Sequence, residues 1–127
     1  MKIIAAHDVG VALNPAKIEG QLEGSCLQGQ GYALTEDFRV ENGIHLTKNL
    51  AQCRIPTIKD VPDIQCIIIE DPEPKGPLGA KGISEVATVP VTPAIINAIY
   101  NAVGIRITDL PATRERILEG IKNKKDR

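Results

Sequence analysis

The chain has 127 residues, which is enough for one domain with its own hydrophobic core. Aromatic residues make up only 2% of the sequence and tryptophan is absent, which argues against a platform on which bases or sugars stack. The formal net charge is −1, so neither a nucleic acid nor an anionic membrane is expected as a partner. A basic C-terminal tail, which we expect to be solvated, comprises Lys122, Lys124, Lys125 and Arg127.

The three cysteines, Cys26, Cys53 and Cys66, are widely spaced and form no Cys-x-x-Cys motif. We therefore expect no disulfide framework and no zinc site, and a reduced, cytoplasmic location fits this cysteine usage better. No N-terminal signal sequence is visible, and no apolar run approaches the roughly 20 residues that span a bilayer.

The first predicted element is a short buried strand, Lys2–Ala6, with His7-Asp8 at its end. These two side chains could exchange a proton, although a hydrogen-bonded structural pair is the commoner arrangement at a strand terminus. Asn14-Pro15 then has the signature of a helix start, and we expect a helix to about Leu34. Its core-facing stripe, at helical spacing, is Ile18, Leu22, Cys26 and Ala33.

Glycines recur inside this predicted helix, although each costs roughly 0.5–1 kcal/mol relative to alanine. We therefore expect a close approach to the helix backbone at Gly20, Gly24, Gly29 and Gly31. Gln21 and Gln28, seven residues apart, project on the same side of the helix. This face either offers amide groups to a polar ligand or packs tightly against another helix, and periodicity alone does not separate the two.

The middle of the chain predicts a hairpin and one clear strand. Asn42-Gly43 between the extended segments 37–40 and 44–47 is a strong hairpin signal, with His45 on the polar face. The segment Lys48–Pro62 is predicted as loop with a helical turn. Ile64–Glu70 is rich in β-branched residues and predicts a strand.

The last third of the chain predicts two helices and a short strand. Thr92-Pro93 repeats the helix-start signature, so a helix is expected over Ala94–Val103, ended by Gly104. Its small-residue face is formed by Ala94, Ala98 and Ala102. A short strand over 105–107 and a last helix from Pro111 through Leu118 to Gly120 complete the prediction of an α/β domain, with a small mixed sheet packed against two main helices.

The stretch Gly76–Glu85 has three glycines and a proline ahead of a single carboxylate, Glu85. Glycines let a backbone approach a ligand closely, so Glu85 is either aimed into a site or solvated on a surface loop. A phosphate-binding P-loop is not expected, because Lys81 is followed by Gly82-Ile83 and not directly by serine or threonine.

The order and spacing of several motifs resemble the C-terminal end of the molybdenum-binding subunit of the xanthine dehydrogenase / aldehyde oxidase family. The resemblance extends from about Ile3 to Ile121. The motifs that carry it are Asp8–Gly10, Asn14-Pro15, Gly20–Gly24, Gln28-Gly29, Gly79–Glu85, Thr92–Ile99 and Leu110–Thr113.

This resemblance implies an enzyme that hydroxylates a purine, another N-heterocycle or an aldehyde, with water as the oxygen source. The implied cofactor is molybdenum on a pterin, as molybdopterin or its cytosine dinucleotide form. Glu85 matches the catalytic general base of the family, and Gln21 matches a glutamine that hydrogen-bonds the pterin. Gln28-Gly29 matches the family segment beside that glutamine. Ser84 stands where many family members have glycine. We expect Glu85 to lie in a dry pocket, where a carboxylate becomes a better base.

The resemblance also implies that most of the active site lies outside this sequence. Family subunits are several times longer, and their other cofactor-binding motifs and substrate-clamping aromatic residues lie upstream. We therefore interpret residues 1–127 as a single domain, the C-terminal segment of a molybdopterin-binding domain. Its expected partners are the upstream portion of the subunit and the iron–sulfur and flavin subunits, and without them we expect no bound cofactor and no activity.

Two alternatives remain open at this point. The chain is either a catalytic piece of that enzyme or a stand-alone remnant without catalysis that self-associates as a homo-oligomer. A weaker third alternative is a binding module that uses the glutamine–glycine helix for another ligand.

Overall fold

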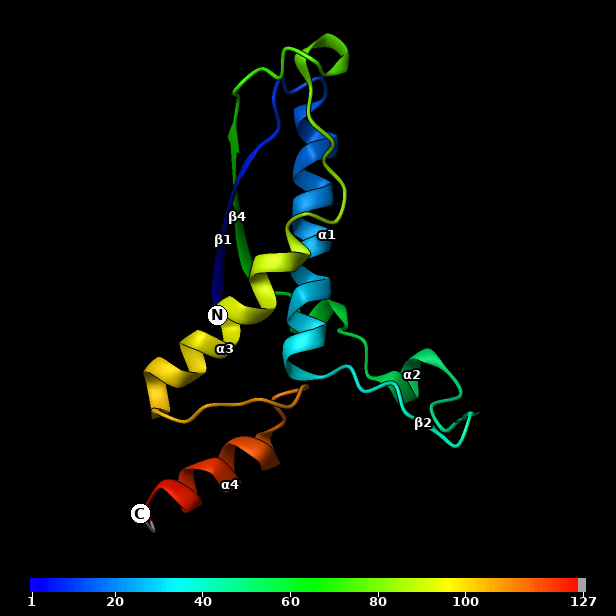
Figure 1. The fold of residues 1–127 in the computed structure, drawn as a ribbon, viewed down its shortest axis with the longest axis vertical. Coiled ribbons are helices and arrows are strands. Elements are labelled where there is room, and N and C mark those ends of the chain that lie inside the picture. Colours follow the sequence, from blue (N-terminus) through cyan, green and yellow to red (C-terminus); the bar gives the residue numbers. More distant parts are fainter. Residues whose placement is uncertain (126–127) are drawn as a thin grey trace.

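Figure 1 shows the computed structural model, which describes residues 1–125. The long helix α1 (Pro15–Leu34) runs beside a parallel pair of strands, β1 (Lys2–Asp8) and β4 (Asp63–Ile69). Helix α3 (Thr88–Val103) packs against α1, and α4 (Arg114–Lys125) forms the C-terminal end of the described structure. The fold class is α/β, as predicted.

The parallel pair is covered on one face only. Lys2 pairs with Asp63 and the register continues to Asp8 opposite Ile69. Ala5 is the one buried residue of β1, whereas Ile4 on the other face is 60% exposed. The prediction of a buried first strand was therefore wrong, because within residues 1–125 only the α1 side of the sheet is packed.

Helix α1 begins and ends as predicted. The Asn14 side chain accepts a hydrogen bond from the Lys17 amide at 3.1 Å, and Pro15 occupies the first turn. The predicted stripe is buried, with Leu22 fully so at 0% exposure. The hydrophobic core consists of Ala5, Val9, Ile18, Leu22, Cys26, Ala33, Ala87, Val91 and Ile95.

The predicted hairpin is present but shorter than expected, with β2 (Val40–Glu41) antiparallel to β3 (Ile44–His45). Asn42 and Gly43 both have positive φ, at 50° and 78°, which is what a tight hairpin turn requires. His45 is exposed and its ring meets that of Phe38 edge-on. The hairpin is separate from the parallel pair, and the loop after it contains the helical turn α2 (Leu50–Cys53) and a 3-10 turn at Ile58–Asp60.

Helix α3 starts earlier than the sequence suggests. Its first residue is Thr88, so Thr92 is not the N-cap and Pro93 lies inside the helix. Burial of Ala87 and Val91 against α1 favours the additional turn, and tertiary packing overrides the local proline signal. The predicted end is confirmed, since Gly104 has φ 67° and its N–H donates to the Tyr100 carbonyl at 2.7 Å.

Two predictions at the C-terminal end were wrong. Residues 105–107 form no strand, and α4 continues through Gly120 to Lys125. Ile105 is buried against Gly120, where an added Cβ would lie 2.8 Å from the Ile105 Cδ1 atom. Gly120 therefore permits close packing and does not end the helix. Of the basic tail, Arg127 lies outside the described residues.

Within residues 1–125, no helix is both long enough and apolar enough to cross a bilayer.

Candidate functional site

The glycine-rich loop is anchored to the segment that follows β1. The Val11 amide donates to the Gly79 carbonyl and the Lys81 amide to the Val9 carbonyl, each at 2.9 Å. Gly10 has φ 65°, and a Cβ at this position would overlap the Gly79 carbonyl oxygen. The loop can thus approach this closely only because residue 10 is glycine.

An ion pair adds to this anchor. The Lys81 ammonium is bonded to the Asp8 carboxylate and lies 3.8 Å from that of Asp71. The Lys81 hydrogen bond and then the Gly10 amide lower the pKa of Asp8, and the bond to Asp8 raises the pKa of Lys81. Asp8 is therefore engaged with Lys81 rather than with His7, so within residues 1–125 neither the proton-transfer pair nor the hydrogen-bonded His7–Asp8 pair considered from the sequence is formed. Within the part of the chain that the structure describes, Nδ1 of His7 is buried without a hydrogen-bond partner.

Glu85 lies where the loop enters α3. Its side chain is exposed, so the dry pocket that the resemblance implies is not formed within residues 1–125. Its backbone is fixed on both sides: the Ser84 carbonyl accepts a hydrogen bond from Ser25 Oγ at 3.1 Å, and the Glu85 carbonyl accepts one from the Thr88 amide at 2.9 Å. The backbone at Glu85 is thus held by α1 and by the first turn of α3.

Gln28 takes part in the contact between the two helices. Thr88 Oγ1 lies 3.2 Å from the Ser25 carbonyl and 3.3 Å from Gln28 Oε1, and it donates to these acceptors. Gln28 Nε2 in turn donates to the Tyr32 hydroxyl at 3.3 Å. Gln28 and Ser84 are thereby connected through one small polar network around Ser25.

The four helix glycines fall into two groups. An added Cβ at Gly29 would lie 2.7 Å from Val91 Cβ, and one at Gly31 would overlap the Glu36 side chain. These two positions serve packing within the described chain. At Gly20 and Gly24 an added Cβ would meet nothing within 4 Å, and Gln21 between them is exposed. This half of the glutamine–glycine face is open to a ligand.

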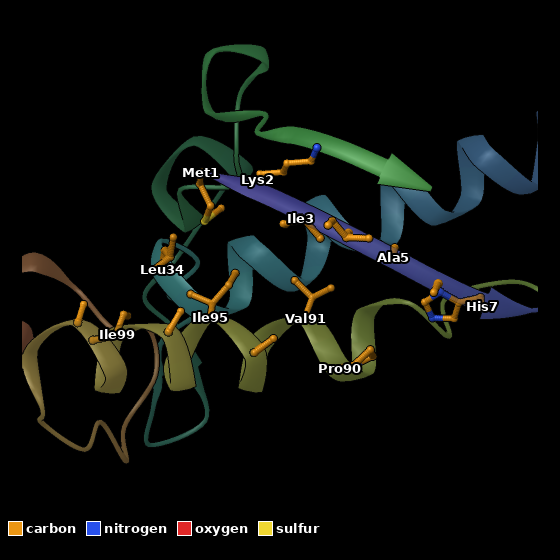
Figure 2. Close-up of a pocket in the computed structure, with 15 residues that line it drawn as sticks. Met1, Lys2, Ile3, Ala5, His7, Leu34, Pro90, Val91, Ile95 and Ile99 are labelled. Carbon is orange, nitrogen blue, oxygen red and sulfur yellow. The ribbon is translucent and has the colours of Figure 1, made fainter. Parts of the chain in front are cut away.

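A groove of about 750 Å³ runs between β1 and α3. Figure 2 shows Val91 and Ile95 pointing from α3 toward β1, where Ile3 and Ala5 lie on the other side. The predicted small-residue face of α3 also lines the groove, through Ala94, Ala98 and Ala102. None of the predicted cofactor-binding or catalytic residues lines the groove. The groove is therefore separate from the region around Glu85.

The candidate site contains no metal-ligand cluster of its own. Over residues 1–125, no three histidine, cysteine or acidic side chains come together in a way that could hold a metal ion. All three cysteines are free. Burial, as the largest cause, raises the pKa of the Cys26 and Cys66 thiols.

Ser25 and Thr88 are the residues that sequence reasoning missed. Ser25 follows Gln21 by four residues and precedes Gln28 by three, so its place on the glutamine face was readable from the spacing. Thr88 was hidden because the helix was expected to start later. Their hydroxyls connect residues about 60 apart in sequence, which no local pattern reports.

Comparison with known proteins identifies the class. A family model described as a molybdopterin cofactor-binding domain matches residues 1–62. A probable xanthine dehydrogenase subunit of Bacillus subtilis is 40% identical over 115 residues, and the aldehyde oxidoreductase of Megalodesulfovibrio gigas is 40% identical over 116. Each alignment covers 91% of this chain, but only 15% and 12% of the respective relative.

The fold agrees with the sequence matches. The crystal structure of quinoline 2-oxidoreductase from Pseudomonas putida 86 superposes with a TM-score of 0.85 at 34% identity, over 94% of this chain and 16% of that one. The homologues of this chain are therefore molybdenum-binding proteins of the xanthine dehydrogenase and aldehyde oxidoreductase type, as the sequence motifs predicted. It spans less than a fifth of the length of these relatives.

Proposed function

We propose that this chain is the piece of a molybdenum hydroxylase that supplies the general base, Glu85, and one wall of the cofactor site. The observation that carries the proposal is the bond between Ser25 Oγ and the Ser84 carbonyl, 3.1 Å long. It holds the Glu85 loop against the face of α1 that also bears Gln21. This bond supports the proposal that Glu85, as proton acceptor, and Gln21, as cofactor contact, act on one side of α1.

The exposed half of this face fits a flat, polar group such as a pterin. Gln21 offers both a donor and an acceptor, and Gly20 and Gly24 leave the helix backbone accessible on the neighbouring side of α1. We propose that Gln21 and Ser84 contact the cofactor directly. Gln28-Gly29 would lie at the far end of the same surface, where α3 already covers part of it. When bound, molybdopterin or its cytosine dinucleotide form supplies the redox chemistry.

The Glu85 carboxylate acts as the proton acceptor when water-derived oxygen is added to a carbon of the substrate. Proposed substrates are a purine, another N-heterocycle or an aldehyde, consistent with the names of the relatives. A general base works best at a site that excludes water, and Glu85 is exposed in this chain. We therefore propose that another part of the enzyme closes over it.

The covering part would be the upstream portion of a molybdenum-binding subunit, since the chain spans only 15% of its Bacillus subtilis relative. Iron–sulfur and flavin subunits would then carry electrons away. In this view residues 1–127 are one domain, the C-terminal segment of a molybdopterin-binding domain, which binds no molybdenum and turns over no substrate without its partners.

Metal and pterin analysis tests this proposal. The purified chain is compared with the same chain co-expressed with the remainder of such a subunit. We expect molybdenum near one equivalent in the assembled protein and none in the chain alone. Stoichiometric molybdenum in the chain alone would overturn the division of the site between two parts.

The groove between β1 and α3 supports a second candidate function, a self-associating module without catalysis. Within residues 1–125 one edge of β1 is unpaired, and Ile4 and Ile67 are exposed on the outer face of the parallel pair, at 60% and 41%. Such an edge beside an apolar groove is a common site for association. Light scattering on the purified chain separates this candidate from a monomer.

A further inference from the structure

The peptide groups on both sides of Glu85 are held by hydrogen bonds. The Ser84 carbonyl accepts from Ser25 Oγ at 3.1 Å, and the Glu85 carbonyl accepts from the Thr88 amide at 2.9 Å. The first bond comes from α1 and the second from the first turn of α3. Together they restrict the backbone dihedrals of Glu85, and therefore the direction in which its side chain leaves the backbone.

Ser25 is well placed to carry this restraint because it is itself fixed. It is 5% exposed, and its carbonyl accepts from Thr88 Oγ1 at 3.2 Å while its hydroxyl donates to Ser84. Gln21, Ser25 and Gln28 are spaced i, i+4 and i+7, so they share one face of α1. The face that we propose for the cofactor is thus the one that holds the base.

We infer that Ser25 is a positioning residue that sets the place of Glu85 relative to the cofactor-binding face of α1. This inference rests on the proposed role of Glu85 as the base. Proton transfer needs heavy atoms within roughly 2.6–3.2 Å of one another. A displacement of about 1 Å can lower a rate about 100-fold. Ser25 acts through the Ser84 peptide group and touches none of the reacting atoms.

Thr92 provides a matched control. Its hydroxyl donates to the Gly29 carbonyl at 2.8 Å, so it also joins α3 to α1 by one side-chain bond. That bond lies seven residues beyond Glu85 and does not touch the Ser84–Glu85 peptide group. Loss of the Thr92 hydroxyl therefore weakens the same helix pair without releasing the base.

The first test uses NMR relaxation on the 127-residue chain itself. In Ser25→Ala we expect the order parameter of the Glu85 amide to fall from about 0.85 to below about 0.6. In Thr92→Val the order parameter of the Glu85 amide should stay at the wild-type value. In Ser25→Thr, which keeps a hydroxyl, it should also stay near the wild-type value. An unchanged order parameter in Ser25→Ala, in a variant that remains folded, would overturn the inference.

The second test uses the assembled, molybdenum-loaded enzyme. Ser25→Ala should lower kcat about 10- to 100-fold. We expect KM and molybdenum content to stay at the wild-type values, because Ser25 does not contact the cofactor. Thr92→Val should change kcat less than about twofold, because it leaves the base in place. An equal loss of kcat in both variants would show general loosening of the helix pair and would overturn the inference.

The two tests also separate this inference from the proposed function. If Glu85→Gln keeps full turnover, Glu85 is not the base and the function fails, whatever the order parameters show. If Glu85→Gln abolishes turnover while Ser25→Ala retains both wild-type kcat and an ordered Glu85 amide, only the positioning role fails.

Discussion

Gly29 and Val91 lie in contact where α1 crosses α3, and the space between them is too small for a methyl group. An added Cβ at Gly29 would lie 2.7 Å from Val91 Cβ and 3.1 Å from the Thr88 carbonyl oxygen. This contact sets how closely the two helices approach. It therefore sets how closely the Glu85 end of α3 approaches the glutamine face of α1.

Gly29→Ala should destabilise the chain because α3 must move away to admit the methyl group. Overpacking of this kind costs about 1–3 kcal/mol in unfolding free energy. The matched control is Gly24→Ala, where an added Cβ meets nothing within 4 Å. That substitution should stabilise α1 by about 0.5–1 kcal/mol through helix propensity alone. Urea unfolding measures the unfolding free energy of both variants. A change of the same sign in Gly29→Ala and Gly24→Ala would contradict the packing role of Gly29.

Much of this arrangement could be predicted from local sequence. Asn14-Pro15 identified the start of α1, and the buried stripe from Ile18 to Ala33 followed from helical spacing. Asn42-Gly43 identified the hairpin for an equally local reason, the positive φ of both residues. Where a backbone preference and a burial pattern coincide, sequence is sufficient.

The errors have non-local causes. Thr92-Pro93 carries a helix-start signal, yet contact of Val91 with α1 moves the start to Thr88. Gly120 carries a helix-end signal, yet Ile105 packs on it and α4 continues. The exposure of Glu85 belongs to the same class, because burial of a side chain depends on packing partners that the local sequence does not report. Local patterns report propensity and do not report which partner a surface meets.

The Asp8–Lys81 pair should make the anchor of the glycine-rich loop sensitive to acid. Hydrogen bonds from Lys81 and Gly10 lower the pKa of Asp8 below its usual value of 3.8. The stabilisation is therefore fully present above that value and is lost as the pH falls through the lower pKa of the folded state. Lys81, whose pKa is raised from 10.5, loses its contribution only at strongly alkaline pH.

The measurement is unfolding of the wild type and of Asp8→Asn between pH 2 and 7. We expect the wild type to be the more stable at neutral pH and the difference to shrink as the pH falls below about 4. Asp63→Asn is the control, since Asp63 and Lys2 are 3.7 Å apart and both largely exposed. A stability difference that grows toward low pH would contradict the assignment.

Cys26 should resist thiol reagents until the chain unfolds. The residue is fully buried, and burial, followed by the nearby Cys66 and Glu23, raises the pKa of its thiol. Both effects keep the reactive thiolate scarce and inaccessible at neutral pH. Timed alkylation with mass spectrometry should show modification of Cys53 before Cys26. Early labelling of Cys26 in the native chain would show that the packing between α1 and the sheet is looser than described.

The groove between β1 and α3 should determine whether the chain associates with itself. If the groove is the contact surface, Ala98→Glu places a charge there and should weaken association at least about tenfold, or about 1.4 kcal/mol. Asn97→Glu, an exposed α3 position outside the groove, is the matched control. Light scattering across a concentration series measures both. A wild-type chain that stays monomeric at high concentration would remove the self-associating alternative.

The most direct test of the central claim is Glu85→Gln in the assembled enzyme. The amide keeps the shape of the side chain but cannot accept the proton, so turnover should fall by about 10²–10⁴-fold. Molybdenum and pterin content should remain at the wild-type level, and Glu119→Gln, an exposed carboxylate on α4, should behave as wild type. Loss of turnover with the cofactor retained is the predicted result. Full turnover in Glu85→Gln would contradict the assignment of Glu85 as the general base.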